Sequence, residues 1–102
     1  MQSSVALLVA ASASMGAAWS ITAYSDAHCT DSTGFHLGQE GTIGCVGISS
    51  NETIKSIGVT DMSNDLIFQG SSGFSCNNFH QTGGNGCYTQ GQHFQSFTVN
   101  QK

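Results

Sequence analysis

Residues 54–59 are Ile-Lys-Ser-Ile-Gly-Val, and residues 94–99 are Phe-Gln-Ser-Phe-Thr-Val. Both segments follow the pattern apolar-x-Ser-apolar-x-Val, and each closes a half of the chain that contains two cysteines. Trp19 and Leu66 open these halves, and each stands ten residues before a cysteine. Two matching halves indicate a duplicated β-motif, with motif 1 at about residues 19–61 and motif 2 at about residues 66–102.

The alternation of apolar and polar residues predicts short strands at residues 19–24, 53–59, 66–70 and 93–99. Turn-forming residues separate these segments, and no segment keeps helical spacing for longer than one turn. The sequence therefore predicts an all-β fold, an antiparallel β-sandwich. In the closing strands, period-2 alternation directs one set of residues into a shared core and places Ser56 and Ser96 on the opposite face. The inward set is Ile57, Val59, Phe97 and Val99.

Residues 1–18 are predicted to be a signal peptide. Residues 5–13 form an apolar run too short to cross a membrane, and Gly16-Ala17-Ala18 supplies the small residues that precede a cleavage site. A buried N-terminal helix is the alternative. Cleavage after Ala18 leaves residues 19–102 as a single small domain, secreted and extracellular.

All four cysteines follow the predicted cleavage site, and an even number in a small secreted chain indicates two disulfides. Four cysteines allow three pairings. The duplicated unit favours bridges inside each motif, which pair Cys29 with Cys45 and Cys76 with Cys87.

Charge is scarce in this sequence. Lys55 and Lys102 are the only cationic side chains, and the formal net charge is −4. Contacts with phosphates or anionic lipids need lysine or arginine, so we expect no nucleic-acid partner and no adsorption to membranes. Asn51-Glu52-Thr53 is an N-glycosylation sequon in an expected loop, and we expect a monomer.

We expect no catalytic residue, metal or cofactor. The four histidines show no metal-binding spacing, although a zinc site assembled in space is the alternative. Residues 70–76 resemble a nucleophile elbow only superficially and are predicted to be a corner loop, while residues 61–65 are predicted to join the two motifs. The histidines are His28, His36, His80 and His93.

Five aromatic residues fall in or near the predicted turns. Exposed aromatic residues on loops above a rigid sandwich commonly bind a partner, so these residues are candidates for partner binding. The alternative is that they fill the ends of a small core. They are Tyr24, Phe35, Phe74, Phe79 and Tyr88.

The closing segments, residues 51–59 and 91–99, resemble the end of a Greek-key motif in the βγ-crystallin family, and residues 21–26 are similar to that family's first strand. Two motifs form one domain in the family, so the resemblance covers nearly all of the mature chain. It implies a disulfide-stapled sandwich of two Greek-key motifs. The chain departs from the family's usual aromatic residue with glycine about seven positions later, because Tyr24 is followed only by Gly34.

Many microbial members of that family bind calcium through the pattern Asn/Asp-Asn/Asp-x-x-Ser/Thr-Ser. Here Glu52 takes the second position and Lys55 replaces a hydroxyl ligand, while the second motif offers Gln95 and no carboxylate. We therefore expect no tight calcium binding. Ser56 and Ser96 are expected to be structural, capping the turn that begins each last strand.

The resemblance to small secreted microbial and fungal members implies a non-catalytic binding protein with a killer-toxin-like, antimicrobial or effector-like role. Its partner would be an extracellular protein or a cell-wall glycan. Two alternatives remain open, an inhibitor of a secreted enzyme and a structural or stress-associated cell-wall protein.

Overall fold

The computed structural model describes residues 18–102, so the predicted signal peptide lies outside the described residues apart from Ala18. Within that range the only regular secondary structure is β-strand, which confirms the predicted fold class. The strands are β1 (Trp19–Tyr24), β2 (Ser32–Gln39), β3 (Ile43–Gly47), β4 (Ile54–Thr60), β5 (Leu66–Ser71), β6 (Phe79–Gly83), β7 (Gly86–Phe94) and β8 (Ser96–Gln101).

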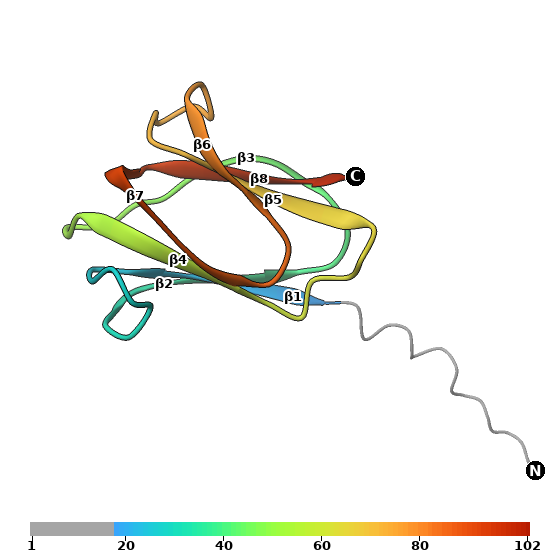
Figure 1. The fold of residues 1–102 in the computed structure, drawn as a ribbon, viewed down its shortest axis with the longest axis horizontal. Coiled ribbons are helices and arrows are strands. Elements are labelled where there is room, and N and C mark those ends of the chain that lie inside the picture. The colour runs from blue at the N-terminus through green and yellow to red at the C-terminus, as the bar shows by residue number, and fades with distance from the viewer. Residues whose placement is uncertain (1–17) are drawn as a thin grey trace, which may run out of the picture.

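The strands form two antiparallel four-stranded sheets that face each other as two layers (Figure 1). The strand order is β2-β1-β4-β7 in the first sheet and β3-β8-β5-β6 in the second. Three strands of each sheet come from one half of the chain, and one edge strand comes from the other half. Because β7 pairs with β4 and β3 pairs with β8, the two halves exchange their third strands.

The chain passes from the first sheet to the second at Gln95. The alternation of residues 93–99 predicts one strand, whereas β7 ends at Phe94 and β8 begins at Ser96. The Gln95 amide donates to the Ser71 carbonyl at 2.9 Å, and the Gln95 carbonyl accepts from the Ile48 amide at 2.9 Å. Phe94 and Phe97 are both buried although they stand three positions apart, so the alternation changes phase at this corner.

The hydrophobic core lies between the sheets. Trp19, Ile21 and Ala23 on β1 are fully buried, and the Trp19 indole donates to the Gly41 carbonyl at 2.8 Å, which satisfies its only polar atom. Full burial of an aliphatic or aromatic side chain contributes about 1.5 to 3 kcal/mol. The predicted inward positions are confirmed, since each is at most 1% exposed: Ile57, Val59, Phe97 and Val99.

The predicted disulfide pairing is wrong. Cys29 pairs with Cys87 and Cys45 with Cys76, with Cα separations of 6.1 Å and 5.8 Å. The prediction assumed that each half closes on itself, but Cys45 lies on β3 and Cys87 on β7, the two exchanged strands. Each bridge therefore joins a strand from one half to a loop from the other.

Two loops with the same succession of bends and turns follow the first strand of each half. The first hairpin loop, residues 25–31, connects β1 to β2, and the second hairpin loop, residues 72–78, connects β5 to β6. Cys29 and Cys76 occupy corresponding places in them, each with φ of 56°. Residues other than glycine adopt this left-handed conformation only when surrounding contacts hold them there.

In each half, a fully buried serine on the closing strand, β4 or β8, supplies those contacts to the loop. Ser56 Oγ accepts from the Cys29 amide at 3.1 Å and donates to the Asp26 carbonyl at 2.6 Å. Ser96 Oγ likewise accepts from the Cys76 amide at 2.9 Å and donates to the Gly73 carbonyl. The serines thus cap the loops after the first strands, and not the turns that begin the last strands.

Candidate functional site

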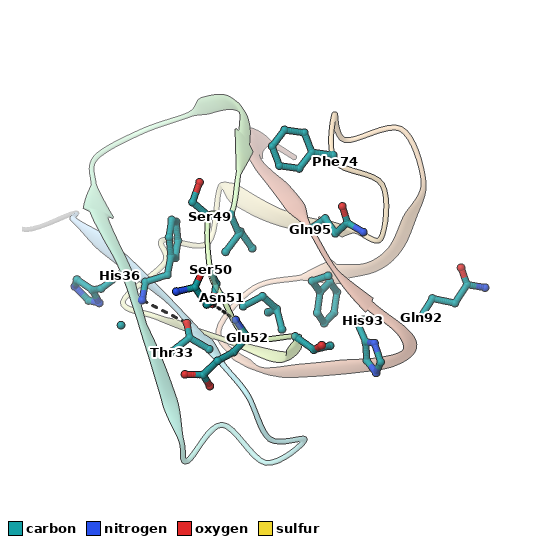
Figure 2. A pocket seen from close by; sticks show the side chains of 16 residues that line it. Thr33, His36, Ser49, Ser50, Asn51, Glu52, Phe74, Gln92, His93 and Gln95 are labelled. Atoms are coloured by element: carbon teal, nitrogen blue, oxygen red, sulfur yellow. Dashed lines mark hydrogen bonds between the residues drawn. The ribbon is translucent and has the colours of Figure 1, made fainter.

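An open groove of about 1270 Å³ lies where loops from both halves meet. Its walls come from β2, from the loop that connects β3 to β4, and from the corner between β7 and β8. Figure 2 shows the connecting loop between the β2 residues Thr33 and His36 on one side and Gln92 and His93 on the other. Phe74 reaches the groove from the second hairpin loop.

Apolar side chains line the deeper part of the groove. Ile48, Ile54 and Phe94 belong to the buried core, and none is more than 6% exposed. Phe35 is half-buried and packs edge-on against Phe97, with ring centroids 6.1 Å apart. Because these residues are held by the core, this part of the groove is preformed.

The rim of the groove is polar and nearly uncharged. Glu52 is its only carboxylate, and neither lysine of the chain lines it. Several rim groups are fixed by local bonds: Ser50 Oγ accepts from the Glu52 amide at 3.0 Å, and His36 Nδ1 lies 2.9 Å from Thr22 Oγ1. The remaining rim side chains are hydroxyls, amides and a second imidazole, on Thr33, Ser49, Asn51, Thr53, Gln92, His93 and Gln95.

The predicted aromatic candidates do not form one surface. Phe35 and Phe74 line the groove, and Phe74 is the most exposed large apolar side chain among residues 18–102, at 61%. Phe79 is 44% exposed but does not line the groove. Tyr88 packs on the core residue Phe68 with ring centroids 5.1 Å apart.

The two tyrosines among these candidates do not line the groove. The Tyr88 phenol donates to the Gly84 carbonyl at 2.6 Å, and burial raises its pKa. Tyr24 lies over Gly58, where an added Cβ would come within 3.0 Å of its ring. Tyr24 also lines a second hollow of about 610 Å³ beside the Cys29–Cys87 bridge, which shares no lining residue with the groove.

Neither a three-residue metal cluster nor a hydrogen-bonded nucleophilic triad is found among the described residues. Within residues 18–102, no group of three histidine, cysteine or acidic side chains is placed to hold a metal ion. His36 and His93 both line the groove, whereas His28 and His80 do not. No hydrogen bond in the described part of the chain links a serine, a histidine and a carboxylate as a nucleophilic triad would require.

The strongest carboxylate interaction is structural and was not foreseen from the sequence. Asp26 accepts from the Thr30 hydroxyl at 2.6 Å and from the amides of Asp31, Thr30 and His28 at 2.8 to 3.0 Å. The Thr30 hydroxyl, followed by the Asp31 amide, holds the Asp26 pKa well below its usual range. This carboxylate organises the first hairpin loop and lies outside the groove.

The groove itself was also missed. The sequence does contain a sign of this groove, because a polar segment precedes each closing strand, at residues 49–53 and 91–93. Only the arrangement of the two sheets brings these segments to one end of the sandwich.

The comparisons with known proteins identify no relative of this chain. The described residues contain no helix long and apolar enough to cross a membrane. No protein-family model matches the chain, and comparisons with curated proteins and with solved structures found no match either.

Proposed function

We propose that this protein is an extracellular, non-catalytic binding protein that receives its partner in the groove. The observation that carries the proposal is the groove itself, which has a preformed base of core residues, a polar and almost uncharged lining above it, and an exposed aromatic ring at one side. Two disulfides in so small a domain are consistent with an oxidising, extracellular environment.

The chemistry of the rim favours a neutral cell-wall glycan as the partner. Hydroxyl and amide side chains such as Ser49 and Gln95 match the hydroxyls of sugars as both donors and acceptors. The face of an exposed aromatic ring, here Phe74, suits the C–H surface of a sugar ring. Neither lysine lines the groove, so no cationic side chain there can select an anionic polymer, and the carboxylate of Glu52 would repel one.

The biological setting follows the family resemblance. The matching hairpin loops, each capped by a buried serine, support the resemblance to two-motif βγ-crystallin-like domains. A secreted glycan-binding domain of this type would act as a toxin-like or effector-like protein at the surface of another cell.

The test uses protein made in the bacterial periplasm, where disulfides form and N-glycans are absent. Co-sedimentation with insoluble chitin, β-glucan and mannan would measure binding. We expect saturable binding to at least one polymer, with Phe74→Ala reducing affinity about tenfold, as for loss of an aromatic anchor worth about 1.4 kcal/mol. Phe79→Ala is the matched control and should bind as the wild type does.

Two results would reject the proposal. One is the absence of saturable binding to any polymer, and the other is an equal effect of Phe74→Ala and Phe79→Ala on a binding curve.

A second candidate is inhibition of a secreted enzyme. The second hairpin loop projects above the upper layer in Figure 1, carries Phe74 and leads to Phe79, and is anchored through Cys76 to Cys45 on β3. A rigid projecting loop with exposed aromatic residues is suited to enter an enzyme cleft. In this case both phenylalanine variants should weaken inhibition of secreted hydrolases, whereas glycan binding should depend on Phe74 alone.

A further inference from the structure

The sequon Asn51-Glu52-Thr53 lies in the groove wall. It occupies the irregular segment between β3 and β4, and the side chains of Asn51 and Thr53 are exposed. Among residues 18–102, the Asn51 amide makes no hydrogen bond that a modification would break. Figure 2 places Asn51 between Ser50 and Glu52, among the residues that line the groove.

We propose that Asn51 is N-glycosylated and that its glycan lies along the groove, where it controls access to the binding site. In the transfer step, Asn51 Nδ2 forms a bond to C1 of the first sugar of a lipid-pyrophosphate-linked oligosaccharide. The bond from C1 to the pyrophosphate breaks, the lipid pyrophosphate leaves with the bonding electron pair, and the amide nitrogen loses one proton. Thr53 supplies the hydroxyl that completes the acceptor sequence.

The fold accommodates this modification without disturbing the core. The sequon ends at Thr53, immediately before the buried residue Ile54, so the attached sugars extend from the surface. The modification and the two disulfides also belong to the same secretory environment.

The position of Asn51 directs the first sugars toward the groove. The opposite wall, at Gln92 and Gln95, offers amides to sugar hydroxyls. This placement rests on the proposed function, because a groove suited to a neutral glycan is also suited to the chain's own glycan. The glycosylated form would then be closed to an external partner and the unmodified form open.

Occupancy is tested first. The full chain is secreted from a eukaryotic cell, and its intact mass is measured before and after enzymatic removal of N-glycans. We expect a mass excess that the enzyme removes, that persists in Thr53→Ser, and that is lost in Thr53→Ala and Asn51→Gln. An unmodified wild-type chain would overturn the proposal, as would a mass excess that Thr53→Ala retains.

Coverage of the groove is tested through the histidines. Diethyl pyrocarbonate modifies accessible imidazoles, and peptide mass mapping gives a rate for each one. In the glycosylated wild type, relative to unmodified Thr53→Ala, we expect several-fold slower modification of the groove residues His36 and His93. His28 and His80 lie outside the groove and should be unchanged.

If each histidine were modified at the same rate in the glycosylated wild type as in Thr53→Ala, the glycan would point away from the groove, and the proposed coverage would be refuted. Neither readout uses an external ligand. A failure to bind polysaccharide would therefore reject the proposed function, while the mass and modification measurements would still decide independently whether Asn51 carries a glycan and where that glycan lies.

Discussion

Removing one disulfide at a time should destabilise the domain by an amount that depends on the separation of the paired cysteines. The Cys29–Cys87 bridge spans 58 positions and the Cys45–Cys76 bridge spans 31. Loop-closure entropy of the unfolded chain gives a stabilisation of about 4.2 kcal/mol for the first and about 3.7 kcal/mol for the second. Either value is a large part of the roughly 5 to 15 kcal/mol typical of a folded domain.

The variants are Cys29→Ala with Cys87→Ala, and Cys45→Ala with Cys76→Ala. Urea unfolding at pH 7 should show a lower midpoint for both, with a slightly larger loss for the first pair. Because the 45–76 loop lies inside the 29–87 loop, each bridge shortens the loop that the other closes, so each single removal should cost somewhat less than these values, and removing all four cysteines should cost more than the sum of the two single losses. A loss of under about 1 kcal/mol in either variant would refute the entropic reasoning.

The pairing of the four cysteines can be tested with one proteolytic cut. Lys55 is the only lysine or arginine before the last residue, so trypsin cleaves the unfolded, oxidised chain once in the domain, between Cys45 and Cys76. With the observed pairing, the two fragments stay joined until a reductant is added. Fragments that separate without a reductant would contradict the observed bridges, because bridges within each half leave each fragment independent.

A second digestion distinguishes the observed disulfide pairing from the remaining one. Chymotrypsin cleaves after Phe35 and Phe79, which separates the two cysteines of each fragment. The linked peptides should then carry Cys29 with Cys87. A linked peptide carrying Cys29 with Cys76 would contradict the structure.

Replacing Ser56 or Ser96 by alanine should cost about 1 to 3 kcal/mol, because each change removes a buried hydroxyl and leaves a partly buried loop amide, that of Cys29 or Cys76, without its partner; a midpoint equal to that of an exposed-serine control would contradict it. Phe97→Ala should cost about 3 to 5 kcal/mol in the same urea assay, since the ring is fully buried, and a smaller loss would mean that the core collapses around the gap. Asp26→Asn should lower stability at pH 7. Its folded-state pKa is lowered, so the stabilisation is present above the ordinary carboxyl pKa of about 4 and is lost as the pH falls; a deficit that persists in acid would oppose this reasoning. Millimolar calcium should leave the melting temperature unchanged relative to chelator, and a rise of roughly 10 °C would overturn that expectation.

The sequence predicts the parts of the fold that depend on local periodicity. Alternation located β1, β4 and β5 and part of β8, which it joined to the end of β7, and it assigned residues such as Ile57 and Phe97 to the core. These strands are buried on one face, so their pattern is strong. Residues 31–34 and 38–41 have the composition of turns, yet much of both segments lies in β2. Glycine, serine and histidine weaken the alternation of this edge strand, and strand pairing overrides their local preference.

The pairing of strands from different halves could not be predicted from the same signal. The partner of β3 is decided by contacts with β8, far away in sequence, and nothing in residues 43–47 specifies it. The disulfide assignment and the groove both depend on this exchange. Individual site residues such as Phe74 were identified as exposed aromatics, but the companions of Phe74 in the groove required the three-dimensional arrangement.

The exchange of third strands also sets the order in which the native bridges become possible during synthesis. In the secretory route proposed for this protein, Cys29 and Cys45 would enter the oxidising compartment before Cys87, because synthesis proceeds from the N-terminus. A bridge between those first two cysteines would hold β3 beside its own half and keep it from β8. If that early bridge formed on the proposed route, thiol–disulfide exchange would have to reopen it before the native bridges could close.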